Sequence, residues 1–141
     1  MNIYVGQIYI EAGINYPFSH IFQRWIHKEL SNLVPDSSVF EQKYPGYNVI
    51  FNMSSKAKLT ETLIMGPTVF KKNKDIEFSI FLPYLKHDRS DPNSLREPLR
   101  LLLDAIATVL RNLGADVSAL IERTDSIIDH ILSDSSMIKI E

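Results

Sequence analysis

The feature that most constrains the fold is a leucine-rich stripe near the carboxyl end of the chain. Its members recur at three- and four-residue spacing and are Leu95, Leu99, Leu102, Leu103, Ile106, Leu110 and Leu113. This spacing places the apolar side chains on one side of an α-helix. Gly114 follows directly, in the position where glycine commonly ends a helix. A helix with so continuous an apolar stripe has to be buried, so the fold needs a second apolar layer.

Two further stretches show helical periodicity. Residues 18–33 alternate apolar and polar side chains with a helical period, and Pro35 prevents the pattern from continuing. After Asp116, which can cap a helix, apolar residues recur from Val117 to Ile131. The sequence therefore predicts three amphipathic helices.

Four other segments have the composition of strands, because they are rich in β-branched and aromatic residues between polar or glycine–proline breaks. They are residues 2–10, 47–54, the pair 59–65 and 68–71, which Gly66-Pro67 separates, and 75–84. The connecting "SSKAK" and "KKNK" are typical of successive turns in an antiparallel meander. We therefore expect an α+β fold in the order β-α-β-β-β-α-α. An antiparallel-rich sheet of about four to five strands would carry the helices on one face.

The chain length of 141 residues suits one domain, residues 1–141, with a single core. The net charge of −2 lacks the basic excess of dedicated nucleic-acid binders, and no cysteine is present for disulfides or thiolate metal sites. The start lacks the features of a signal peptide, and no apolar stretch approaches the length of a membrane span. We therefore expect a cytoplasmic protein and favour a monomer.

The stretch "KHDRSDPNSLREPL" gathers the most reactive side chains and raises the question of an active site. Hydrolytic chemistry on His87, Asp88 and Asp91 would require these neighbours to face one another, which adjacent loop residues rarely do. A helix entrance explains the stretch better, either through a Ser94–Glu97 capping box or through Asp91 before a proline. We interpret the stretch as a helix entrance and keep the catalytic reading as an alternative.

The histidines and lysines indicate no metal, cofactor or nucleic-acid site. His20 and His27 are seven residues apart, about 10 Å along a helix, whereas zinc ligands on one helix stand four apart. The lysines of the two turns, Lys56 and Lys58 in one and residues 71–74 in the other, are expected at opposite edges of the sheet. They are typical of solvated turns that discourage edge pairing.

The candidate partner-binding residues are acidic. Glu122, Asp125 and Asp129 fall on one side of the last predicted helix, and Asp116 stands at its start. From Asp116 onward there are six acidic and two basic side chains, so a basic partner would be attracted to this end of the chain. The simpler alternative is a solvated helix face.

Three segments, in order, carry a family resemblance: "IYVGQIYI", "FSIFLPYLK" and "PLRLLLDAIATVLRNLGADVSAL". Together they resemble an immunity-protein family of bacterial contact-dependent growth inhibition and related polymorphic toxin systems. The resemblance implies a cytoplasmic protein that binds the toxic C-terminal domain of its cognate effector, often a nuclease, and blocks it. It supplies no residue set to carry over to this chain.

Three functions follow from these observations. The first is an immunity protein, not an enzyme, that occludes a toxin domain one to one. The second is a structural or adaptor subunit that oligomerises through a sheet edge. The third is a small hydrolase or nuclease that uses His87, Asp88 and Asp91.

Overall fold

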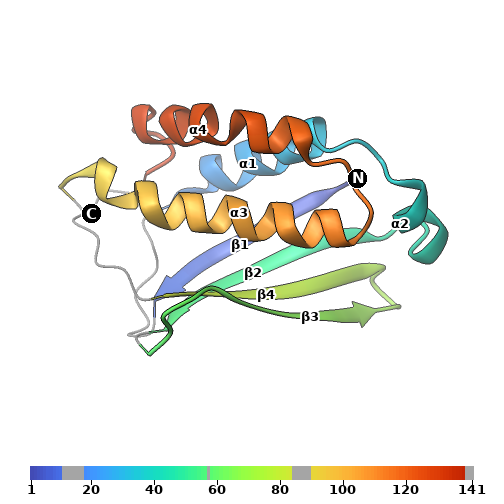
Figure 1. Ribbon diagram of the computed structural model, residues 1–141. Helices are drawn as coiled ribbons and strands as arrows, with labels where there is room; N and C mark the ends of the chain where they lie inside the picture. Colours follow the sequence, from blue (N-terminus) through green and yellow to red (C-terminus); the bar gives the residue numbers. More distant parts are fainter. Residues whose placement is uncertain (11–17, 57, 84–89, 139–141) are drawn as a thin grey trace.

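A four-stranded sheet and the helices packed on it form the fold in a computed structural model, which describes residues 1–10, 18–56, 58–83 and 90–138 (Figure 1). In chain order the elements are β1 (Ile3–Ile10), α1 (His20–Leu33), α2 (Ser38–Lys43), β2 (Asn48–Lys56), β3 (Leu63–Phe70), β4 (Asp75–Pro83), the 3-10 turn η1 (Pro92–Leu95), α3 (Arg96–Asn112) and α4 (Ser118–Ser133). The predicted α+β class and the order β-α-β-β-β-α-α are confirmed. The short α2 and the 3-10 turn η1 are additional elements that the predicted order did not contain.

The strand pairing differs from the predicted meander. The strands lie in the order β1-β2-β4-β3, and the pairs β1–β2 and β2–β4 are parallel. Only β3 and β4 form the expected antiparallel hairpin, through the turn at residues 71–74. The prediction of an antiparallel-rich sheet was therefore wrong. The last strand in the chain enters the sheet between β2 and β3, and this placement makes β3 an edge strand.

The two faces of the sheet have different environments. Residues of one parity on β2 and β4 are buried, and they pair in register as Val49 with Ile76, Phe51 with Phe78, and Met53 with Ile80. Residues of the other parity are half-buried or exposed. Alternation along these strands thus divides the sheet into a core face and an open face.

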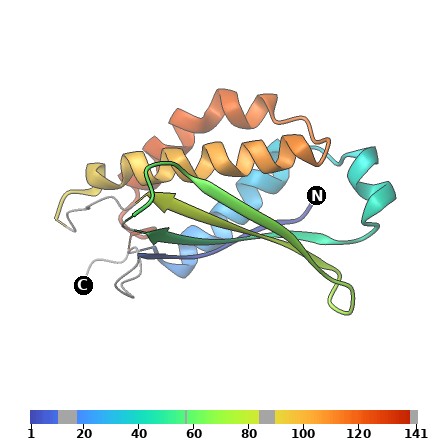
Figure 2. The ribbon, with the colours of Figure 1, turned by 60° about the horizontal axis from the view of Figure 1, so that its bottom comes forward.

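The helices cover the core face only. Figures 1 and 2 show α1, α3 and α4 on the same side of the sheet, as predicted. α1 contacts β1 and α3 contacts β4, whereas α4 packs against α1 and α3 from outside. The predicted stripe on α3 is buried, and Leu102, Ile106 and Leu110 have no exposed surface.

Local capping fixes where the helices begin and end. The Ser19 hydroxyl accepts a hydrogen bond from the Phe22 amide and starts α1. Gly114 adopts a φ of 85°, so it ends α3 in the left-handed conformation that the sequence predicted. A hydroxyl–carbonyl hydrogen bond of 2.6 Å from Ser19 to Ser136 then ties the start of α1 to the segment after α4.

Among the described helices, none combines the length and the apolar character that crossing a bilayer would require.

Near the carboxyl end, Ile138 forms an antiparallel bridge with Phe18, and residues 139–141 lie outside the described range.

Candidate protein-interaction surfaces

The stretch that raised the question of catalysis divides between described and undescribed residues. His87 and Asp88 lie outside the described residues. Asp91 accepts a 3.0 Å hydrogen bond from the Asn93 amide and caps η1, with Pro92 in the first position of that turn. Asp91 is therefore engaged in starting a helical segment, as one of the two predicted helix entrances requires.

The other predicted entrance is not formed. α3 begins after Leu95, which provides no side-chain cap, and the Ser94 hydroxyl donates to the Asp91 carbonyl instead. Because η1 intervenes between the loop and α3, the capping box of Ser94 and Glu97 was a wrong prediction.

Two of the four predicted partner-binding carboxylates form ion pairs across the helix layer. Asp125 on α4 accepts from Arg100 on α3 at 2.6 Å, and Asp129 pairs with Arg96 at 2.9 Å. The hydrogen bond and charge of Asp125 raise the pKa of Arg100 above its ordinary value. Both carboxylates remain accessible, but their charge is balanced by a neighbouring guanidinium.

The other two predicted residues, Glu122 and Asp116, form neither of these ion pairs and differ from each other in their contacts. Glu122 is exposed on α4. Asp116 accepts hydrogen bonds from the amide and the hydroxyl of Ser118, at 3.0 and 2.6 Å. These bonds lower the pKa of Asp116, the side-chain bond most strongly, because they stabilise the charged form. Asp116 was predicted as the cap of this helix, but the N-cap position is occupied by Val117, which makes no side-chain cap hydrogen bond. Asp116 stands one residue earlier and binds Ser118, the first residue of α4.

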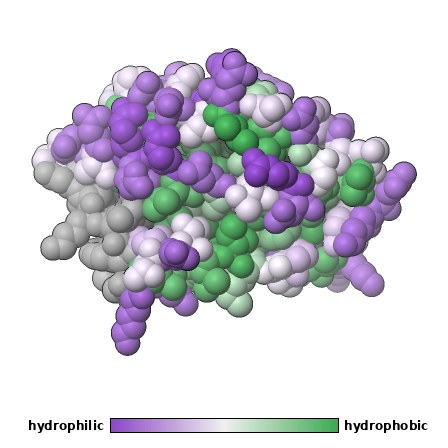
Figure 3. Space-filling model, viewed as in Figure 1, coloured by the Kyte–Doolittle hydropathy of each residue, from purple (hydrophilic) through white to green (hydrophobic). Residues whose placement is uncertain are grey.

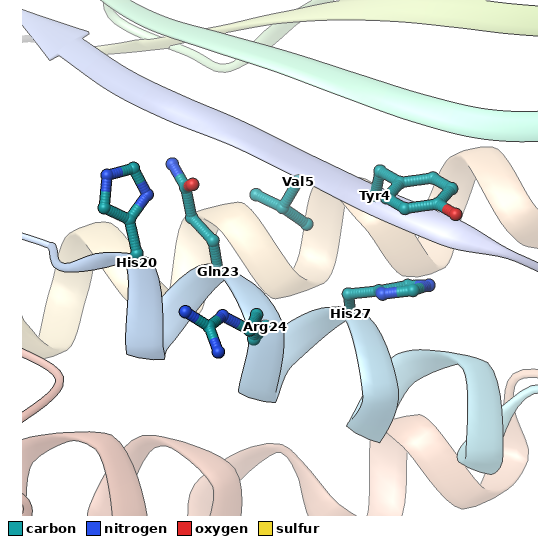
Figure 4. Close-up of a pocket in the computed structure, with 6 residues that line it drawn as sticks. All are labelled: Tyr4, Val5, His20, Gln23, Arg24 and His27. Atoms are coloured by element: carbon teal, nitrogen blue, oxygen red, sulfur yellow. The ribbon is translucent and has the colours of Figure 1, made fainter.

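A groove of about 280 Å³ lies between β1 and α1 (Figure 4). Its polar lining comes from successive turns of α1, namely His20, Gln23, Arg24 and His27. In Figure 4, His20 and Gln23 point toward β1, while Arg24 extends along the near side of the helix. The ring of His27 stacks on Tyr4 at 4.1 Å. The groove is open to solvent, and its nitrogen-bearing side chains do not converge on one point.

Metal ligands do not gather in the part of the chain that the structure describes, since no three His, Cys, Asp or Glu side chains are grouped there to hold an ion. Within the groove the ring of His27 is stacked on Tyr4, and His130 stacks on Trp25 at 4.5 Å. Both histidines thus take part in aromatic contacts with neighbouring elements.

The largest exposed apolar feature of the sheet is on β3. Leu63, Met65 and Phe70 are 44%, 54% and 42% exposed. Their β4 partners in the hairpin are Phe81, Ser79 and Asp75, which all belong to the open face. Leu63, Met65 and Phe70 therefore project from the open face, and we call these three residues the β3 patch.

Neighbouring side chains extend the β3 patch. Phe81 lies opposite Leu63 and is half-buried, and the ammonium of Lys56 stands 4.4 Å from the centre of the Phe81 ring. Large apolar side chains gathered on an open sheet face are typical of a protein-interaction site. Figure 3 views the molecule from the side on which the helices lie, and there too hydrophobic surface continues from α3 down to the strands below it.

The outer edge of β3 is unpaired but interrupted. The register shifts between Met65 and Thr68, where Gly66 and Pro67 stand opposite one residue of β4. A side chain at residue 66 would place its Cβ 2.9 Å from the Glu77 carbonyl oxygen, so glycine is required there. Pro67 has no amide to donate, and a bulge with proline discourages the addition of another strand. The face of β3 is therefore more suited to binding than its edge.

Reasoning from the sequence missed the β3 patch. The segment "LIMGPTVF" is apolar at both parities, which is usual for a strand buried on both faces. Its position at the sheet edge depends on the insertion of β4 beside β2, and no local pattern encodes that insertion. The one available signal was Pro67, because proline inside a strand indicates an edge.

The chain has no significant match among protein-family models, curated proteins or solved structures.

Proposed function

We propose that this protein is an immunity-type inhibitor that binds a cognate bacterial toxin domain in the cytoplasm and performs no chemistry of its own. The single observation that carries the binding function is the β3 patch, where three large apolar side chains project from a sheet face that none of the described helices covers. The toxin as partner is supported by the three sequence segments that resemble the immunity family.

The physical basis is the free energy of removing apolar surface from water. Burial contributes about 25 cal/mol per Å² of apolar area, so a partner that covers Leu63, Met65 and Phe70 gains a central apolar contact. The strand that carries them is held through its neighbour, because β3 is paired with β4 and β4 packs on α3. A rigid surface loses little conformational entropy on binding, which favours tight association.

The proposal accounts for inhibition by occlusion. An inhibitor of this kind has to cover the reactive surface of the toxin, or hold it in an inactive form, and needs only a complementary surface. The open sheet face offers such a surface on one side of the molecule.

On this proposal, the reading frame immediately upstream of this gene encodes a large secreted toxin, and the test uses the C-terminal domain of that upstream product. We expect the full chain to co-purify with that domain and to restore growth of cells that express it. In the double variant Leu63→Thr with Phe70→Thr, both effects should weaken, with affinity reduced about 10- to 100-fold, as for loss of central interface residues. Threonine keeps strand propensity, so the substitutions change polarity more than folding.

The matched control is Ile121→Gln on α4. Ile121 is 49% exposed, close to the values for the β3 patch, but it lies on the helical side of the molecule. Affinity should be unchanged in this variant. Failure of the wild-type chain to bind or protect against the upstream domain would refute the immunity function. Equal losses of affinity in Ile121→Gln and in the Leu63→Thr with Phe70→Thr variant would show that these substitutions weaken binding by destabilising the fold and not by removing a contact.

A further inference from the structure

Lysines stand at both ends of the β3 patch. Lys56 ends β2 beside Pro83, with Lys58 two residues later, and Lys71 and Lys72 follow β3 directly in the turn to β4. Since β2 and β4 are parallel, these two groups lie at opposite ends of the sheet, as the sequence predicted. An eight-residue strand separates them by about 25 Å.

Acidic side chains on the open face are already engaged by amides. Asp75 accepts from the Asn48 amide at 3.3 Å, and Glu77 accepts from the Asn52 amide at 2.7 Å. Within the described part of the chain, neither carboxylate lies within ion-pair distance of a lysine. The lysines at the two ends therefore keep their charge available to a partner.

The distribution of charge over the molecule is uneven as a result. Residues 56–77 carry five lysines and three carboxylates, whereas the whole chain has a net charge of −2. On the helical side, the arginines of α3 balance Asp125 and Asp129. The excess positive charge thus accompanies the exposed apolar side chains, and the acidic helix is largely neutralised within the chain.

We infer that the partner surface recognised by the β3 patch is acidic: a protein face with an apolar strip flanked by carboxylates at both ends. The inference rests on the proposed function. It gives the partner surface a negative charge, whereas the acidic helix led to the expectation of a basic partner. Opposite charges around an apolar contact accelerate association and select the register, and the lysines at the two ends can do both.

The experiment compares charge reversals on the two sides of the molecule in the complex with the upstream toxin domain. Affinity is measured for the wild type, for Lys71→Glu with Lys72→Glu, and for Glu122→Lys, at about 50 and 300 mM salt, ionic strengths that differ strongly in screening. We expect the lysine variant to bind about 3- to 30-fold more weakly at low salt, with a shallower salt dependence. Glu122→Lys should bind like the wild type.

The possible results separate this inference from the proposed function. Stronger binding by the lysine variant would mean that the partner surface at the β3 patch is basic. Weaker binding by Glu122→Lys alone would mean that the partner is basic and faces α4. Either result would overturn the inference. Unchanged affinity in the lysine variant together with wild-type binding would also overturn the inference, while the immunity function would stand. Absence of any complex with the wild-type chain would remove the function, and the inference with it. Circular dichroism of each variant verifies that the fold is retained.

Discussion

At the scale of single residues, most of the polar side chains that drew attention in the sequence organise local structure. Asp91 caps η1, and Asp116 binds both donors of Ser118 at the start of α4. Asp134 repeats this arrangement with Ser136 after α4, and hydrogen bonds from Ser136 lower its pKa in the same way. Carboxylates at the junctions of loops and helices thus accept hydrogen bonds from nearby backbone amides.

The Asp116–Ser118 contact predicts a specific dependence of stability on pH. The folded-state pKa of Asp116 is lowered, so its contribution is present above the ordinary aspartate pKa of about 4 and is lost as pH falls through the folded-state value. Asp116→Asn keeps an acceptor but does not titrate. The Tm of the wild type should exceed that of Asp116→Asn at pH 7, and the difference should shrink toward pH 3.

The control for this prediction is Ser118→Ala, in which the hydroxyl donor is lost and the carboxylate is kept. In proteins that carry Ser118→Ala, the Tm difference between Asp116 and Asp116→Asn should depend less on pH than it does with Ser118 present. A Tm difference between wild type and Asp116→Asn that is constant from pH 7 to pH 3 would contradict the assignment.

At the same scale, the sequence predicted Gly114 and the Asp91-Pro92 start correctly because both depend on local backbone geometry. It failed at Ser94 and Glu97 because a capping box and a 3-10 turn use the same residue types, and the choice depends on the position of Leu95, which is buried in the core. Tertiary packing decided between two local solutions of similar quality.

At the scale of elements, α3 and α4 are joined by two ion pairs in addition to their apolar contact. Asp125 and Asp129 are one helical turn apart, and so are Arg96 and Arg100, so the two pairs form a ladder between the helices. This ladder explains why acidic spacing on one helix is weak evidence for a partner site. The sequence placed the carboxylates on one side of α4 but gave no indication that arginines from α3 would face them.

A double-mutant cycle on Arg96 and Asp129 measures this ladder. With Arg96→Gln, Asp129→Asn and the double variant, urea unfolding should give a coupling free energy of about 0.2–1 kcal/mol in low salt, smaller in high salt. Coupling indistinguishable from zero in low salt would contradict the ladder and leave Asp129 free to bind a basic partner.

Element existence was predictable for the strands and the three long helices, whereas strand direction was not. β2 and β4 alternate buried and half-buried residues, and this period of two is the same in parallel and antiparallel pairs. Only the β3–β4 hairpin had a short turn to fix its direction. α2 was missed because six residues are too few to establish a helical period.

At the scale of the whole molecule, the architecture is one-sided. All of the long helices lie on one face of the sheet (Figure 2), and the β3 patch projects from the other face. This arrangement was predicted as helices on one face, but its consequence for function depends on which strand is at the edge. The prediction that acidic α4 is the binding surface rested on the excess of carboxylates in the sequence after Asp116.

The oligomeric state separates the inhibitor from the adaptor that would assemble through a sheet edge. Because Pro67 and the bulge interrupt the outer edge of β3, we expect a monomer by light scattering at micromolar concentration. The Leu63→Thr with Phe70→Thr variant should have the same mass. A wild-type dimer that dissociates in this variant would favour assembly through β3 and would contradict one-to-one occlusion.

The position of β4 between β2 and β3 also has a consequence for synthesis on the ribosome. A nascent chain that has exposed only residues 1–70 holds three strands, but the inner sides of β2 and β3 lack the strand that will lie between them. The sheet is completed at its centre only when residues 75–83 emerge, and its core face is covered only when α3 follows. Growing chains therefore carry the unpaired inner edges of β2 and β3 until residue 83 has emerged, and a chaperone that shields apolar segments would have its largest effect on yield in this interval.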